Sequence, residues 1–231
     1  MTTPEFERLQ EALVECRRCP RLVAWREEVG VSKRAAFADH DYWARPVPML
    51  GLPSARLLII GLAPGAHGSN RTGRMFTGDR SGEWLFRSLY RAGFANRPDA
   101  ISRGDGFELR DAAITAIVRC VPPRNRPLPK ERDTCAEWIN RELDLCRRVR
   151  VIVALGGMAF DQTLRLGIGR GWRVARPRPR FAHGIEVDLG PDAPALIGCY
   201  HPSQQNTFTG RLTEEMLDAV FGRAARLLRD S

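Results

Sequence analysis

The sequence predicts an α/β protein in which helices cover both faces of a mainly parallel sheet. Short apolar runs rich in Val, Ile and Leu alternate along the chain with longer stretches of helical periodicity. Polar loops follow several of these runs, and ligand sites in such sheets lie at the carboxyl ends of the strands. With 231 residues, the chain suits one domain, residues 1–231, with a full core.

Near the N-terminus, apolar spacing predicts a helix over residues 5–18, and Pro20 is expected to end it. A polar, helix-prone stretch continues to about residue 38. The segment 41–48 is aromatic, contains two prolines and is expected to be irregular.

Five short apolar runs are expected to form strands, because their composition is typical of buried strands: residues 57–60, 112–118, 149–155, 185–189 and 195–199. Helices are expected between and after them, over residues 82–92, 130–147, 157–166 and 212–228.

The composition indicates a polyanionic partner. The formal net charge is +9 and the isoelectric point is near 9.9, which favours nucleic acid. No stretch approaches the roughly 20 apolar residues of a membrane span. The N-terminus lacks the apolar run of a signal peptide. We therefore expect a cytoplasmic protein without a membrane partner.

The loop after the first strand, residues 61–79, organises the chain. A strand, a glycine-rich loop and a helix in this order build an anion site from backbone N–H groups. A turn alone would need only the glycines, whereas this loop also holds Phe76, Asp79 and several arginines. Phe76 is either a loop anchor in the core or a platform for a flat ligand, worth about 1–3 kcal/mol for a base.

A second polar loop contains His201-Pro-Ser203 and follows the run 195–199. A lone histidine after a strand is often structural. The hydrogen-bonding side chains that follow this one make a functional role equally plausible, with Ser203 and backbone N–H groups gripping phosphates.

The six cysteines do not indicate disulfides in a cytosolic chain. Cys16 and Cys19 form a C-x-x-C pair, and Cys120 and Cys135 follow much later. Four thiolates suffice for a zinc ion or a [4Fe–4S] cluster, and the spacing leaves both open. The remaining two, Cys146 and Cys199, lie in apolar surroundings and are expected to be core thiols.

Three motifs together resemble the iron–sulfur branch of the uracil-DNA glycosylase superfamily, and within it family 5, also called type B. They are Gly61-Leu-Ala-Pro-Gly65, Arg71-Thr-Gly-Arg-Met-Phe-Thr-Gly-Asp79 and Tyr200-His-Pro-Ser203. The resemblance covers most of the chain, from Cys16 to about Thr213. It implies a three-layer α/β/α sandwich around a four-stranded, mainly parallel sheet, so one of the five expected strands should be peripheral.

The resemblance also implies a set of functional residues. A [4Fe–4S] cluster would be held by Cys16, Cys19, Cys120 and Cys135. The expected catalytic residues are Asp79, His201 and Asn125. Substrate-binding residues would be Gly61, Ala63, Gly65, Ala66, Phe76, Asn125 and His201, and DNA-binding residues Arg71, Arg74, Arg124, Ser203 and Asn206.

The sequence also departs from other branches of the superfamily. Ala63 stands where the main family has a water-positioning Asp, and Leu62 where family-4 relatives have Glu. Ala116 stands where those relatives place an Asn that reads the uracil edge. The water activator and the uracil reader must therefore come from elsewhere or matter less. The family-5 resemblance implies Asp79 and Asn125 for these roles, and both are present.

The function implied is that of a monofunctional, monomeric DNA glycosylase. It would flip out and excise uracil and other deaminated bases, hypoxanthine among them, by hydrolysing the N-glycosidic bond and leaving an abasic site. A site that relies on stacking rejects analogues poorly, so broad specificity is expected. Two alternatives are a non-catalytic nucleic-acid-binding protein with a structural metal cluster and an electron-transfer protein.

Overall fold

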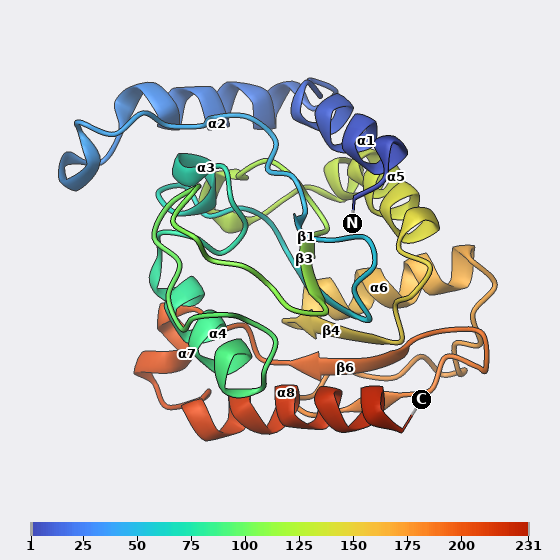
Figure 1. The fold of residues 1–231 in the computed structure, drawn as a ribbon. Helices are drawn as coiled ribbons and strands as arrows, with labels where there is room; N and C mark the ends of the chain where they lie inside the picture. The colour runs from blue at the N-terminus through green and yellow to red at the C-terminus, as the bar shows by residue number, and fades with distance from the viewer. Residues whose placement is uncertain (1, 231) are drawn as a thin grey trace.

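A central sheet organises this computed structural model, which describes residues 2–230. Its strand order is β1-β3-β2-β4-β6-β5 (Figure 1). The four central strands run parallel to one another: β3 (Ala112–Ala116), β2 (Leu57–Gly61), β4 (Val151–Leu155) and β6 (Ala195–Cys199). Every residue of β2, β3 and β4 is buried, which explains their continuous apolar composition.

Two short antiparallel strands form the edges of the sheet. They are β1 (Leu50–Gly51), which pairs with β3, and β5 (Glu186–Val187), which pairs with β6. The expected strand over 185–189 is thus the peripheral one. The sheet has six strands rather than four, because the two edge strands add to the four parallel ones. β1 was not predicted, since two residues are too few to show an alternation of apolar and polar side chains.

Helices cover both faces of the sheet, which confirms the three-layer sandwich (Figure 1). One face is covered by α4 (Arg80–Arg91) and α8 (Glu214–Arg229), and the other by α5 (Pro129–Leu145) and α6 (Gly157–Gly169). At the N-terminus lie α1 (Pro4–Val14) and α2 (Pro20–Ser32). The connections hold η1 (Ala35–Phe37), α3 (Ser69–Thr72), η2 (Pro123–Asn125) and α7 (Gln204–Phe208).

Pro20 corrects one prediction. The helix expected over 5–18 ends at Val14, and Pro20 begins the next helix instead of ending the first. Proline suits a first helical position, because its missing N–H would have no partner there and its φ is already helical.

The parallel strands bring their following loops to one edge of the sheet. Residues 61–79 follow β2, residues 120–129 come shortly after β3, and residues 200–210 follow β6. No helix within residues 2–230 is long and apolar enough to cross a membrane.

Candidate active site

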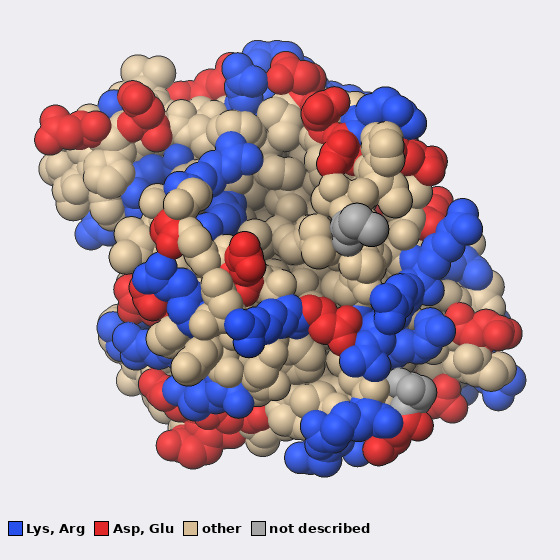
Figure 2. All heavy atoms as spheres, viewed as in Figure 1, with Lys and Arg blue, Asp and Glu red and all other residues tan. Residues whose placement is uncertain are grey.

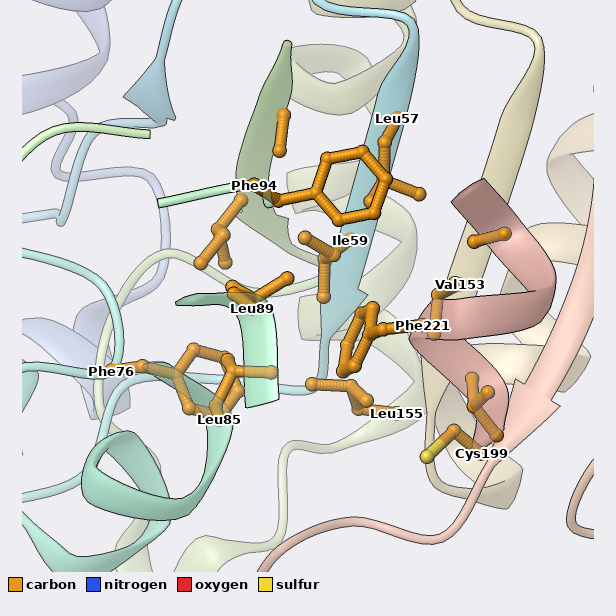
Figure 3. Packing of buried hydrophobic residues seen from close by; sticks show 14 of the residues in the cluster. Leu57, Ile59, Phe76, Leu85, Leu89, Phe94, Val153, Leu155, Cys199 and Phe221 are labelled. Atoms are coloured by element: carbon orange, nitrogen blue, oxygen red, sulfur yellow. The ribbon is translucent and has the colours of Figure 1, made fainter. Parts of the chain in front are cut away.

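Phe76 lies both in the core and at the edge of the candidate site. Its side chain is 9% exposed and packs near Leu85, at the end of the apolar cluster that covers one face of the sheet (Figure 3). Its ring centroid lies 5.7 Å from that of His201, with the two planes tilted by 32°. The two roles considered for Phe76 are therefore compatible.

The backbone at Phe76 adopts a left-handed conformation with φ of 53°. For a non-glycine residue, this costs about 1–2 kcal/mol. The conformation is held because Phe76 N donates to Ser69 Oγ at 3.0 Å. Gly82 is also required, since a Cβ at that position would stand 1.6 Å from Phe76 O.

Asp79 caps helix α4, and its carboxylate faces the glycine-rich loop. Its Oδ1 accepts a hydrogen bond from Gly82 N at 3.0 Å. Its Oδ2 lies against the backbone of the loop, because a Cβ at Gly68 would be only 2.1 Å from it and one at Gly65 3.1 Å. Burial raises the pKa of this carboxyl, and the N–H groups of Ser81 and Gly82 partly offset that rise. The glycines thus make room for a carboxylate beside the predicted anion site.

His201 is an uncharged hydrogen-bonding group at neutral pH. Burial lowers its pKa to about 4, and it lies two residues after the end of β6. Asn206 Nδ2 and Ser203 N both donate to His201 O, at 2.8 and 2.7 Å. Ser203 Oγ in turn caps α7 by accepting from Asn206 N at 3.4 Å. Ser203 and Asn206 therefore hold His201 in place, and the phosphate contacts predicted for them stay predictions.

Arg71 and Arg74 are both 8% exposed, and internal acceptors already use their donors. Arg71 bonds to His67 O at 2.7 Å, to Gly78 O at 3.1 Å and to His40 Nδ1 at 3.0 Å. Arg74 forms a two-bond pair with Asp105 at 2.8 and 2.7 Å. These guanidinium groups hold the loop in shape. The DNA contacts predicted for them stay predictions.

Arg124 and Asn125 are exposed on η2, and both have positive φ values, 54° and 56°. Within residues 2–230, the Asn125 side chain makes no hydrogen bond, so its amide is available to a ligand. Among the described residues, Asn125 makes no hydrogen bond to Asp79 or His201, and the roles predicted for it stay predictions. Of the small residues predicted to bind substrate, Gly61 is buried at the end of β2, and Ala63, Gly65 and Ala66 are half-buried.

The four cysteines expected to bind metal line one cavity, together with apolar side chains such as Leu22 and Trp138. Among residues 2–230, no three His, Cys, Asp or Glu side chains are arranged as ligands of a single metal ion. The all-thiol donor set of this cavity is compatible with a zinc ion and with a [4Fe–4S] cluster.

Arg26 is a residue near this cavity that the sequence analysis missed. It is 2% exposed, and its Nη1 donates to Cys120 Sγ and to Cys16 O, each at 3.1 Å. A buried cation at this place would offset the negative charge of four thiolates. The available signal was its position on the buried stripe of α2 with Leu22 and Val29.

Asn70 joins the cysteine cavity to the loop that carries Asp79. Its Nδ2 donates to Arg26 O at 3.3 Å, and its backbone N donates to Gly65 O at 2.9 Å. The side chain is fully buried. One residue thus ties α2 to the glycine-rich loop.

The sequence model of the uracil DNA glycosylase superfamily matches residues 48–224. The chain belongs to this superfamily. The matched range includes Asp79 and His201. It also includes two of the four cysteines that line the cavity, Cys120 and Cys135.

The relatives of this chain are named as two types of uracil-DNA glycosylase, type 5 and type 4. A type-5 uracil-DNA glycosylase of Mycobacterium bovis is 56% identical over 92% of this chain and 78% of its own length. One of Thermus thermophilus is 50% identical over 96% of this chain and 97% of its own. A type-4 uracil-DNA glycosylase of Pyrobaculum aerophilum is 29% identical over 80% of each chain. These similarities confirm the predicted family-5 resemblance.

Proposed function

We propose that this protein is a monofunctional DNA glycosylase that flips uracil out of DNA and hydrolyses its N-glycosidic bond. The observation that carries the proposal is the placement of Phe76 against a neutral His201 at the sheet edge where the Asp79 loop begins. Relatives over 92–96% of the chain that are 50–56% identical are named uracil-DNA glycosylases.

The reaction requires charge to be stabilised on two sides. Breaking the bond leaves an oxocarbenium-like sugar and an anionic base, so preorganised donors and a carboxylate both lower the barrier. His201 would donate a hydrogen bond to the carbonyl oxygen of the departing base. Asp79 would orient water and oppose the positive sugar. Phe76 would stack on the flipped base, and the N–H groups of Gly65 and Ala66 would help to bind the anion.

We propose that the site also accepts other deaminated bases, hypoxanthine among them. Leu62, Ala63 and Ala116 put apolar side chains where other branches of the superfamily place an acid or an edge-reading amide. Fewer hydrogen bonds to the base edge mean a smaller penalty for a different base. Asn125 is exposed, and its side chain makes no hydrogen bond to any residue of the described range 2–230, so it would be the remaining reader.

We propose further that Cys16, Cys19, Cys120 and Cys135 hold a [4Fe–4S] cluster. The cluster would supply cross-linking rather than a reaction step. Its thiolates would join the segment before α2 to the segment after β3 and to α5. The shared cavity and the Arg26 bond to Cys120 support this donor set. We also propose that the protein acts as a monomer in the cytoplasm.

Single-turnover release of uracil from an oligonucleotide tests the function. His201→Ala should slow release by about 10²–10³, the usual effect of removing one such donor. Asp79→Ala should slow it by a similar or smaller factor, because water attacks after much of the bond has broken. DNA binding by both variants should persist. Between pH 6 and 8, the wild-type rate should show no inflection from His201, since burial lowers its pKa to about 4.

The second candidate, a non-catalytic DNA-binding protein, is favoured only by the positive charge. It predicts that the wild-type protein binds the same oligonucleotide and releases no base. That result would overturn the glycosylase proposal and leave the binding proposal standing.

Iron content and visible absorbance test the cluster. Cys120→Ser should lose both and become less soluble. Cys146→Ser is the matched control, because Cys146 is also a buried thiol but does not line the cavity. A colourless wild-type protein that contains zinc and is fully active would contradict the iron–sulfur assignment without affecting the glycosylase one.

A further inference from the structure

The positive charge of the chain is concentrated in one segment. No Asp or Glu occurs between Asp161 and Glu186. That interval contains six arginines, which equals two-thirds of the net charge of +9: Arg165, Arg170, Arg173, Arg176, Arg178 and Arg180. On the face shown in Figure 2, by contrast, basic and acidic side chains are interspersed.

The end of this segment is fixed to strand β6. Gly184 N donates to Gly198 O at 2.7 Å, and Gly198 N donates to Ile185 O at 2.8 Å. A side chain at Gly198 would prevent this approach, because its Cβ would stand 2.7 Å from Ala182 O. The segment therefore returns along the sheet toward the carboxyl end of β6 (Figure 1).

An aromatic cluster fixes the segment beside the candidate active site. The Phe181 ring lies 5.6 Å from that of Phe160 and 5.8 Å from that of Tyr200. His183 packs on Tyr200 at 5.1 Å, and its Nδ1 accepts from Tyr200 N at 3.2 Å. Tyr200 directly precedes His201. Phe181 thus places the arginine before it, Arg180, at the edge of the sheet that carries the site.

Arg178 and Arg180 are free to bind an external anion. Both are exposed, and neither makes a side-chain hydrogen bond or ion pair with any residue of the described range 2–230. Arg170, earlier in the segment, is different because it pairs with Asp144 at 2.8 Å. Arg211 adds a further cation at this edge, with Cζ 4.6 Å from the Tyr200 ring centroid.

We propose that Arg178 and Arg180 bind backbone phosphates of the DNA strand next to the flipped nucleotide. The proposal rests on the proposed function, because it takes DNA as the ligand of the adjoining site. Guanidinium groups bind phosphates strongly, and such contacts fix the register of the protein on DNA without reading sequence. The aromatic cluster then sets the distance between this phosphate contact and His201.

The test compares two double variants with the same change in charge. Arg178→Gln/Arg180→Gln removes the proposed contacts. Arg147→Gln/Arg148→Gln removes two exposed arginines just before β4, at the opposite end of the strands from the site. The dissociation constant is measured against salt concentration, on a duplex that carries an abasic-site analogue the enzyme cannot cleave.

The first variant should bind DNA with a salt dependence that is shallower by about 1.8 in log–log slope, because each phosphate contact contributes about 0.9. The second should keep the wild-type slope. Arg178→Lys/Arg180→Lys should restore it, since lysine also carries the charge. Uracil release at saturating enzyme should change less than about twofold in the Arg147→Gln/Arg148→Gln control, because those two residues lie at the opposite end of the strands from the site.

Equal changes in the two glutamine variants would show a general charge effect and overturn the proposal, as would an unchanged slope in both. Failure of the proposed function would give a different experimental result. In that case the wild-type protein releases no uracil, whereas the salt slopes are measured without any catalysis.

Discussion

The loops that follow β2 and β3 both contain arginines, and the structure uses those arginines differently. Residues 61–79 and 120–129 both contain arginines and were both expected to contact DNA. In the first loop, Arg71 and Arg74 are buried and bonded to protein acceptors. In the second, Arg124 is exposed. An arginine in a strand-end loop therefore shows only that a charge is present, not that the charge is available.

The difference divides the work of the site. The first loop is a rigid frame in which internal bonds fix Phe76 and Asp79. The second loop presents side chains to solvent, and the positive φ values of Arg124 and Asn125 turn its chain sharply. Changes in the first loop should therefore alter stability and catalysis, whereas changes in the second should alter binding and selectivity.

The largest expected effect is on the frame. Arg74→Ala should lower the free energy of unfolding by about 3–5 kcal/mol, because it leaves the Asp105 carboxylate, whose side chain is only 11% exposed, without its cation. Urea unfolding measures this, with Arg124→Ala as the exposed control. Although burial raises the pKa of Asp105, hydrogen bonds from Arg74 and from backbone N–H groups bring that pKa below 3.8.

The ion pair therefore stabilises the folded protein above pH 4. The difference in the free energy of unfolding between wild type and variant should shrink as the pH falls below that value.

A loss of less than about 0.5 kcal/mol for Arg74→Ala would remove the distinction between the two loops, since that is the range of ordinary surface substitutions. The double variant Arg74→Ala/Asp105→Asn should recover part of the stability, because no unpaired charge then remains and the amide oxygen can still accept from the backbone N–H groups.

The next effect is on the position of Asp79. Gly68→Ala places a methyl group 2.1 Å from the present position of Asp79 Oδ2, so the carboxylate must move. A displacement of about 1 Å can lower a rate about 100-fold. We expect a loss of that order in single-turnover uracil release, with unchanged DNA affinity. Gly169→Ala is the control, because a Cβ there meets nothing within 4 Å. A fully active Gly68→Ala protein would show that Asp79 needs no fixed position.

A smaller effect is expected on selectivity. Asn125→Ala should change the ratio of the uracil and hypoxanthine release rates by about tenfold, because one hydrogen bond to the base is lost. The faster of the two rates should change less. Asn140→Ala, on helix α5, is the control. An unchanged ratio would remove Asn125 as the reader of the base.

The smallest effect concerns Arg124. Arg124→Gln should leave the free energy of unfolding within about 0.5 kcal/mol of wild type. It should make the salt dependence of DNA binding shallower by about 0.9, corresponding to one phosphate. Thermal unfolding and a salt titration of the dissociation constant measure the two values. If stability falls instead, the second loop belongs to the frame as well.

The four parallel strands could be predicted because their burial on both sides leaves a continuous apolar run, as in Val151–Leu155. The helices on both faces followed from their periodicity. The short strand at Leu50–Gly51 could not be predicted, because it depends on β3 for its pairing. Pro20 was assigned the wrong helix end, since the same residue is compatible with either end until the neighbouring chain is placed.

The sequence placed Asp79 and His201 in loops that follow buried strands, and the structure has both residues in such loops, while their catalytic roles stay predictions. Partners that are distant in sequence could not be predicted. Arg74 bonds to a carboxylate 31 residues away, and Arg26 bonds to Cys120 at a separation of 94. Local composition cannot distinguish such internal cations from those that face DNA.

The left-handed backbone at Phe76 has a consequence for how this enzyme would change under selection. Glycine would relieve the conformational penalty at that position, yet it would also delete the aromatic ring beside His201. Because Phe76 also belongs to the core cluster, losing its ring would cost about 3–5 kcal/mol of stability, more than the relieved strain returns. Selection for a lasting fold and selection for base release therefore act in the same direction at this position, and both retain the aromatic ring.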